Sequence, residues 1–192
     1  MNATSAWDSA ASAALTERVP ASRYLLFASI AGLGFLLDIG TKAWVFSLPD
    51  LRAGEIRWLW TDHVGIQLSR NLGALFGIGQ GKVWLFAALS SVALVAIPTW
   101  LFWFRAARDR LITFALGCVM AGVLGNLFDR IGLSGETLGG SVYAVRDWIL
   151  WQANDRWRWP NFNIADSLLV VGACLMVLHS FWYSPPAESK KS

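Results

Sequence analysis

Two aspartates near the end of the chain have the spacing and the surroundings for acid–base chemistry. Asp166 stands at the start of an apolar run long enough to enter a bilayer, and Asn163 precedes it on the same face of a helix. An aspartate in a membrane helix costs roughly 2.5–3.5 kcal/mol at mid-membrane and by default marks a functional site. Near the helix start the cost is lower, but Asp147, nineteen positions earlier, supplies a second acid.

The chemistry that such a pair supports is hydrolysis by water. Two nearby carboxylates without cations of their own repel each other, which leaves one of them protonated at neutral pH. The ionised carboxylate can take a proton from water, while the protonated one donates to a carbonyl oxygen or a leaving amine. A purely structural role stays open if Arg130 or Lys42 serves both acids.

Other polar residues lie inside apolar runs, and we expect them to meet the acid pair in one layer. Asp38 and Lys42 are four residues apart, so they can pair on one helix face, and we expect a structural ion pair. Asn126, Asp129 and Arg130 also share a helix face. Their simplest role is to form hydrogen bonds between helices.

The composition is that of a small integral membrane protein. Of the 192 residues, 55% are hydrophobic and 15% are charged, and the mean hydropathy is +0.45. The 12 Trp residues favour a membrane–water interface. The net charge of +3 without aromatic–basic clusters suits anionic lipid and argues against nucleic acid. Cys118 and Cys174 lie in apolar runs without metal-ligand spacing, so we expect free thiols.

Four apolar runs predict a membrane α-helical fold with four transmembrane helices, because a bilayer core of ~30 Å needs about 20 helical residues. The runs are 24–47, 82–104, 111–131 and 163–183. We expect a mobile tail at 1–23, a transmembrane domain at 24–184 and a C-terminal tail at 185–192. The short link at 105–110 is dense in arginine, which predicts that both termini are cytoplasmic. The Lys and Arg counts of the two sides are equal, so only this density sets the orientation.

The two long links, 48–81 and 132–162, then lie outside. Alternation over Ile56–Trp60 and Val64–Leu68 predicts a β-hairpin turning at 61–63, hence a small extracytoplasmic β-sheet between helices 1 and 2. The small residues of Asn71–Gly77 could admit a ligand to the backbone, although by itself this segment reads as a re-entrant turn. We expect the second link to be an outer loop, mobile first and rich in interfacial Trp later.

Five motifs occur in an order that resembles the lipoprotein signal peptidases, the type II signal peptidases of bacteria. The resemblance covers roughly residues 24–183. The motifs are Asp38-x-x-x-Lys42, Asn71-x-Gly73-Ala74-x-Phe76, Gly122-x-x-Gly125-Asn126-x-x-Asp129-Arg130, Val145-x-Asp147-Trp148 and Phe162-Asn163-x-Ala165-Asp166. Any one of them is weak, but five in order are specific.

The resemblance implies an aspartyl endopeptidase of the bacterial inner membrane. Its substrate would be a diacylglyceryl-modified prolipoprotein, cut just before the lipidated Cys. It implies Asp147 and Asp166 as the catalytic pair. It implies substrate-binding or supporting roles for Asn71, Gly73, Asn126, Asp129, Arg130, Asn163, Ala165, Asp38 and Lys42. It implies no metal and no cofactor, and we expect a monomer that contacts membrane lipid.

Other classes make different predictions. A small proton-coupled transporter or channel would spread polar residues through the bilayer depth, whereas here they gather at one end. A structural or assembly protein would have no use for the glycine-flanked Asn71 segment. We set aside rhomboid-like serine proteases, whose motif is Gly-x-Ser-Gly, and aspartyl membrane proteases with Gly-x-Gly-Asp, on the expectation that the chain has neither motif.

The chain also departs from the family pattern. An insertion at Leu133–Tyr143 carries several glycines and few large apolar residues, so we expect a mobile outer loop. Arg146 stands beside Asp147, Trp148 replaces the common Phe, and the link between the two aspartates is rich in Trp. These changes bear on lipid or peptide selectivity more than on the reaction.

Overall fold

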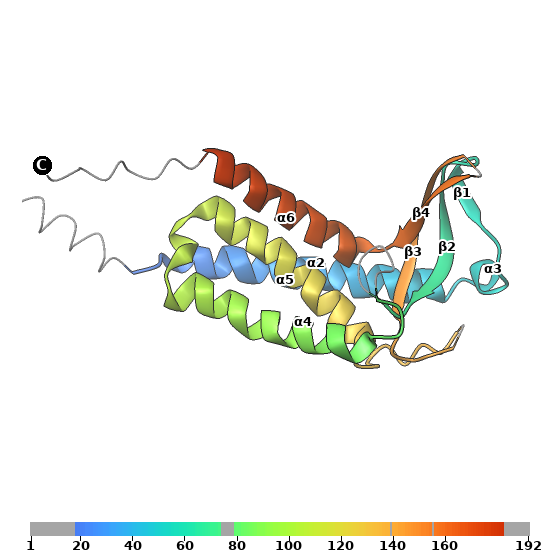
Figure 1. Cartoon of the computed structure of the whole chain (residues 1–192), viewed down its shortest axis with the longest axis horizontal. Coiled ribbons are helices and arrows are strands. Elements are labelled where there is room, and N and C mark those ends of the chain that lie inside the picture. The colour runs from blue at the N-terminus through green and yellow to red at the C-terminus, as the bar shows by residue number, and fades with distance from the viewer. Residues whose placement is uncertain (1–17, 74–78, 139, 155, 183–192) are drawn as a thin grey trace, which may run out of the picture.

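Four long apolar helices form the body of the molecule, which is a computed structural model (Figure 1). The structure describes residues 18–73, 79–138, 140–154 and 156–182. Within this part, four helices are long and apolar enough to cross a membrane, which confirms the prediction. They are α2 (Ala21–Phe46), α4 (Val83–Pro98) continued by the π-helical turn η2 (Thr99–Trp103), α5 (Arg110–Arg130) and α6 (Ile164–Trp182). Most of the two expected tails lies outside the described residues, and α2 begins at Ala21, inside the tail expected at 1–23.

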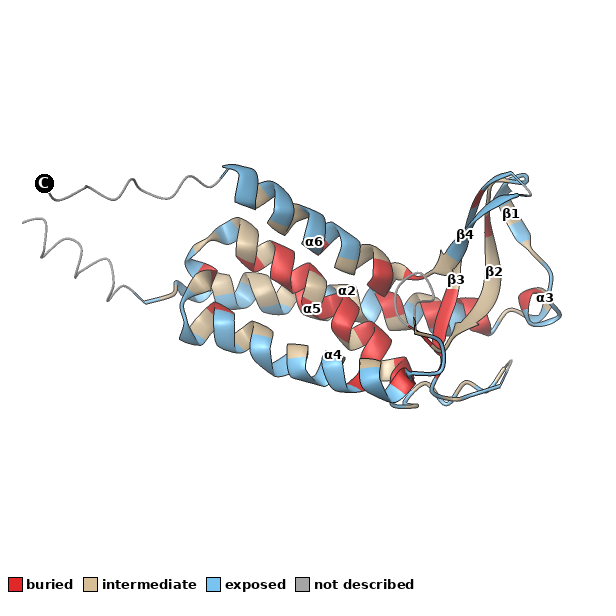
Figure 2. Ribbon diagram, in the orientation of Figure 1, coloured by how far each residue is buried: buried red, intermediate tan, exposed pale blue. Residues whose placement is uncertain are grey.

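The helix α5 is the centre of the bundle. Its apolar window is 67% buried, against 11% for α2 and for α4 and 17% for α6, and Figure 2 shows it as the mostly red helix. Glycines let its neighbours approach closely: a Cβ on Gly122 would meet the carbonyl oxygen of Ala165, and one on Gly125 would meet the Asp38 carboxylate. The three helices therefore touch where their polar residues lie.

The short basic link closes one end of the bundle. It contains the 3-10 turn η3 (Ala106–Arg108), and Asp109 caps α5 by accepting a hydrogen bond from the backbone N–H of Ile112 at 2.9 Å. The other oxygen of Asp109 pairs with His179 in the last turn of α6 at 2.7 Å. The start of α2 lies at this same end, and the sheet lies at the opposite end (Figure 1).

A four-stranded antiparallel sheet crosses the other end of the bundle, in the order β1-β2-β3-β4. The predicted hairpin is present as β1 (Arg57–Trp60) and β2 (Val64–Asn71), after a short helix α3 (Pro49–Arg52). Asp62 takes a left-handed φ of 61° in the turn between the strands, a conformation that Asp tolerates.

The sheet is not confined to the link between the first two helices, because half of it comes from the second long link. There, β3 (Val145–Asn154) and β4 (Trp157–Phe162) replace the outer loop that the sequence led us to expect. The first three residues of β3 are all buried, so the strand lacks the alternation that marks a half-exposed strand. Pro160 fits because β4 is an edge strand, where a missing N–H leaves no ladder bond unmade.

The described part of the insertion at Leu133–Tyr143 is held mainly by polar contacts, in keeping with its few large apolar residues. Glu136 forms an ion pair with Arg52 at 2.9 Å. The guanidinium of Arg70 donates to the carbonyl oxygens of Glu136 and Ser141. Tyr143 packs its ring against Trp84 at the start of α4, with the ring centroids 5.0 Å apart.

Candidate active site

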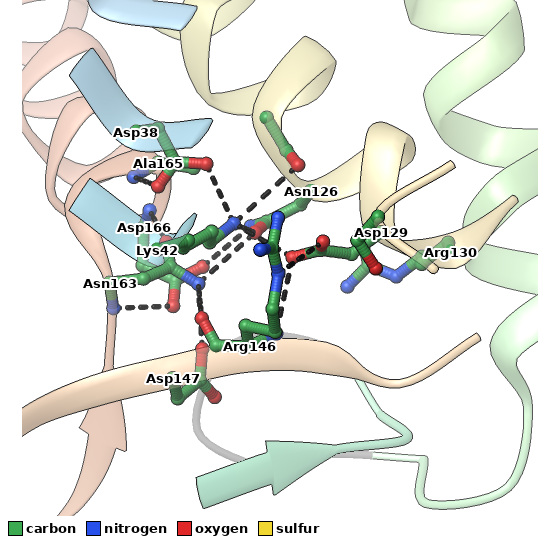
Figure 3. Close-up of polar contacts among 12 residues, drawn as sticks. Asp38, Lys42, Asn126, Asp129, Arg130, Arg146, Asp147, Asn163, Ala165 and Asp166 are labelled. Carbon is green, nitrogen blue, oxygen red and sulfur yellow. Dashed lines mark hydrogen bonds and ion pairs between the residues drawn. The ribbon is translucent and has the colours of Figure 1, made fainter. Parts of the chain in front are cut away.

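Asp147 and Asp166 come together where β3 passes the first turn of α6 (Figure 3). Both carboxylates are buried, with residue exposures of 1% and 6%. Asn163 connects them, because its side-chain amide donates to Asp147 Oδ1 at 2.6 Å and its backbone N–H donates to Asp166 Oδ2 at 3.3 Å. The pairing that the sequence only suggested is therefore a contact through one asparagine.

The first turn of α6 explains why Asp166 is held so firmly. Asn163 is the residue before the helix, and its side-chain oxygen accepts from the backbone N–H of Asp166 at 2.9 Å. Asp166 reciprocates by accepting from the backbone N–H of Asn163, which makes a capping box. Asp38 on α2 accepts the next free donor, the backbone N–H of Ala165, at 2.9 Å. The partial positive charge of the helix start also favours an ionised Asp166.

Asn126 on α5 is the hub between the acid pair and the cations. Its amide nitrogen donates to Asp166 Oδ1 at 2.8 Å. Its oxygen accepts from Asn163 at 3.1 Å and from the Lys42 ammonium at 3.1 Å. Both ends of the amide are thus used, which fixes its orientation.

A buried ionic chain lies behind this hub. Lys42 is fully buried and contacts Asp38 Oδ2 at 2.6 Å, so the ion pair predicted at this spacing is present. The same ammonium lies 3.1 Å from Asp129 Oδ2. Asp129 is also bound by Arg146, through Nε at 2.8 Å and through the backbone N–H at 3.1 Å. Asp38, Lys42, Asp129 and Arg146 therefore alternate in charge along one connected row.

The end of β2 contributes the last group of predicted residues. Asn71 hydrogen bonds to Asp147 through its side chain, and its Oδ1 accepts from the backbone N–H of Gly73 at 2.8 Å. Arg130 donates to the carbonyl oxygen of Gly73 at 3.0 Å, which ties this turn to α5. Residues 74–78, which carry the rest of this motif, lie outside the described residues.

Neither aspartate of the pair has a cation in direct contact within the described residues. Lys42 contacts Asp38 and Asp129, and Arg130 contacts a carbonyl. Burial, followed by the negative charge of Asp166, raises the pKa of Asp147 from 3.8 to about 8, and hydrogen bonds from Asn163 and Asn71 oppose this rise. Asp147 is thus suited to hold a proton at neutral pH, and the start of α6 favours the ionised form of Asp166 within the pair.

All the site residues predicted from the sequence fall within this one network. Arg146 was noted only as a departure from the family pattern, and its contacts with Asp129 were not foreseen. The one signal for it in the sequence was a charge in an otherwise apolar stretch beside Asp147. Among the described residues, no group of three or more His, Cys, Asp or Glu side chains is arranged to hold a metal ion.

The expectation that the rhomboid-like motif is absent was wrong, because a Gly-x-Ser-Gly sequence occurs at 132–135. Ser134 lies in the turn after α5, where its hydroxyl accepts from the backbone N–H of Glu136 at 3.5 Å. His179 pairs with Asp109 at the opposite end of the bundle, and His63 stacks on Trp60 in the hairpin turn. Within the described ranges, Ser134 has no histidine base beside it, so serine protease chemistry has no support there.

The fold and the site define a class: a membrane-embedded helical bundle with a buried carboxylate pair under a small sheet. Comparison with known proteins identifies the family. A family model described as "Signal peptidase (SPase) II" matches residues 30–182. A lipoprotein signal peptidase of Rhodopirellula baltica is 47% identical over 84% of this chain and 74% of its own length, and one of Rhodococcus jostii is 33% identical over 96% and 86%.

Solved structures agree on the fold. A bacterial membrane enzyme determined by the in meso method at 2.3 Å superposes with a TM-score of 0.70 at 24% identity, covering 92% of this chain and 97% of that one. A second such structure, at 1.9 Å, gives a TM-score of 0.66 at 25% identity over 88% and 97%. The chain belongs to the signal peptidase II family, a family of membrane proteases.

Proposed function

We propose that this chain removes the signal peptide of diacylglyceryl-modified prolipoproteins, with Asp147 and Asp166 as the catalytic acids. The single observation that supports these roles best is that the two buried carboxylates meet across Asn163, with no cation of the described residues in contact with either. Family membership supports the prolipoprotein substrate, since the relatives are lipoprotein signal peptidases. A transporter is not favoured, because the polar network lies at one end of the bundle and not through its depth.

The first half of the reaction adds water to the scissile carbonyl. Ionised Asp166 takes a proton from water, and the water oxygen bonds to the carbonyl carbon. Asp147 gives its proton to the carbonyl oxygen, so the tetrahedral intermediate is neutral. Asn163 and Asn126 keep both carboxyl groups oriented throughout, because each donates to one of them.

The second half breaks the C–N bond. Asp166 passes its new proton to the leaving nitrogen, and Asp147 recovers a proton from a hydroxyl of the intermediate. The products are the carboxyl end of the signal peptide and the free amine of the lipidated Cys. Both acids return to their starting states, so the cycle needs no metal or cofactor.

The surrounding features of the proposal follow from the family and the bundle. Residues 24–184 would form the peptidase domain in a bacterial inner membrane, with both termini cytoplasmic and the sheet on the outer side. The arginine-dense link supports this orientation, and both the start of α2 and the end of α6 lie at its end of the bundle. Asn71, Gly73 and Arg130 would hold the substrate, Lys42 and Asp38 would support the pair, and the enzyme would work as a monomer.

The test is cleavage of a diacylglyceryl lipopeptide that carries a fluorophore and a quencher on either side of the scissile bond. The wild type should cleave it and should leave the unmodified peptide intact. Asp147→Asn and Asp166→Asn should each abolish cleavage, because the amide cannot cycle between acid and base. Both variants should still fold, since Asn is nearly isosteric with Asp.

Asp62→Asn is the matched control, because Asp62 lies in the hairpin turn and Asn accepts its left-handed φ. It should cleave like the wild type. Substantial activity in a folded Asp147→Asn or Asp166→Asn variant would remove that aspartate from the catalytic role. Equal cleavage of lipidated and plain peptide would refute the proposed lipid requirement while leaving the peptidase assignment in place.

A further inference from the structure

Arg146 binds an aspartate on a neighbouring helix instead of facing solvent. It precedes Asp147 on β3, yet only 4% of it is exposed. Figure 3 shows its side chain reaching from the strand toward Asp129 on α5, close to Lys42. Its Nε lies 2.8 Å from Asp129 Oδ1, and its backbone N–H donates to Asp129 Oδ2 at 3.1 Å. One carboxylate therefore holds both the side chain and the main chain of Arg146.

These contacts fix the strand where Asp147 emerges. On the N-terminal side of Arg146, its backbone N–H donates to Asp129. On its C-terminal side, its carbonyl oxygen accepts from the side-chain amide of Asn163 at 3.5 Å. The same amide donates to Asp147 at 2.6 Å. The backbone on the N-terminal side of Asp147 is thus tied to α5 and to the first turn of α6, the elements that also hold Asp166.

Arg146 also completes the charge balance of the layer. Among the described residues, Lys42 would without Arg146 be the one cation shared by two carboxylates, Asp38 and Asp129. With Arg146 present, Asp129 has a cation of its own. The positive charge of Lys42 is then not offset by an unpaired Asp129 carboxylate, and it can act on the acid pair. The charged groups around Asp147, taken over every element packed there, are Asp38 and Lys42 (α2), Arg70 (β2), Asp129 and Arg130 (α5), Arg146 (β3) and Asp166 (α6).

We propose that Arg146 is a positioning residue for the reaction, which aligns Asp147 through Asp129 and supplies the charge that balances Asp129. The proposal rests on the proposed function, because it assigns Arg146 a role in that same site. Arg146 does not touch the reacting atoms, so it acts on the catalytic pair and not on substrate affinity.

The test is the pH dependence of kcat and KM for Arg146→Gln, Asp129→Asn and the double variant, measured with the lipopeptide assay. Arg146→Gln removes a positive charge, so the limb of the pH–rate profile that reports ionisation of the acid pair should move to higher pH by about one unit. We expect kcat to be about tenfold lower and KM to be unchanged. Asp129→Asn removes a negative charge and should move the same limb down. The double variant keeps the net charge and should return the limb to its wild-type position.

Arg146→Lys separates charge from alignment. It keeps the charge, so its pH profile should match the wild type, but it loses the Nε contact and should recover only part of kcat. Thermal unfolding of each variant in detergent accompanies the kinetics. Lower stability with an unmoved pH profile in all variants would overturn the proposal and leave Arg146 as a structural residue.

Two further results keep this test decisive. If Arg146→Gln fails to fold, Asp129→Asn and the double variant carry the comparison, and equal profiles for these two would overturn the proposal. The proposed function is judged separately, because it fails only if the wild type does not cleave or the Asn variants of Asp147 and Asp166 remain active.

Discussion

Replacing Asn163 by Ala should uncouple the acid pair while leaving the bundle in place. Among the hydrogen bonds that the substitution removes, two of different kinds involve the acid pair directly. The hydrogen bond that caps α6 at Asp166 is worth about 0.5–2 kcal/mol of stability. The 2.6 Å hydrogen bond to Asp147 involves a group that ionises, and such bonds contribute about 1.5–3 kcal/mol.

The two losses should be visible in different measurements. Loss of the cap should lower the free energy of unfolding by about 0.5–2 kcal/mol, seen as a lower midpoint of thermal unfolding in detergent. The lost contact with Asp147 acts on the reaction, so turnover should fall by about 10–100-fold, because each 1.4 kcal/mol is a factor of ten. Asn163→Asp should be worse, since a third carboxylate would face Asp147 and Asp166.

Ser167→Ala is the matched control for this change. Ser167 lies in the same turn of α6, and its hydroxyl bonds only to the Asn163 carbonyl at 3.0 Å among the contacts described. It should leave turnover within about twofold of the wild type, since the hydrogen bond that it removes goes to a backbone carbonyl and to neither carboxylate of the pair. Wild-type turnover in a folded Asn163→Ala variant would refute the idea that this asparagine joins the pair.

Three further outcomes are expected. Because the pKa of Asp147 is raised to about 8, cleavage that needs its proton should fall as the pH rises through about 8. The contribution of this raised pKa to the stability of the folded state is complete below pH 4 and is lost progressively toward pH 8. Asp147→Asn should therefore flatten the decline of the unfolding midpoint over this range, and an unchanged decline would contradict the assignment. Lys42→Met should lower the free energy of unfolding by about 3–5 kcal/mol, because it removes the cation that Asp38 and Asp129 share. Lys82→Met, at the exposed start of α4, is the control and should change it little. Equal effects of the two variants in thermal unfolding would argue against a buried ionic chain. In a background without Cys118 and Cys174, Ser5→Cys and Thr137→Cys should react with an impermeant thiol reagent from opposite sides of the membrane, and labelling of Ser5→Cys from outside would invert the proposed orientation.

The sequence determined the elements whose signal is local. The four spans follow from the length and hydropathy of continuous runs, and their predicted ends agree with the helices to within three residues. The first hairpin follows from alternation around a short polar turn. The ion pair of Asp38 and Lys42 follows from a spacing of four in one helix. Each of these depends on neighbours a few residues away, which the chain displays directly.

Only the tertiary structure decided which distant groups meet. The strand β3 exists because β2 offers it a pairing edge, with Ser69 opposite Asp147, and nothing within 145–154 alternates clearly enough to show this. The cap of α6 at Ala165 comes from Asp38, which lies 127 positions earlier. The partner of Arg146 is Asp129, 17 positions away on another element. Buried polar groups must find partners wherever the fold brings them, so their pairing depends on packing that no local pattern encodes.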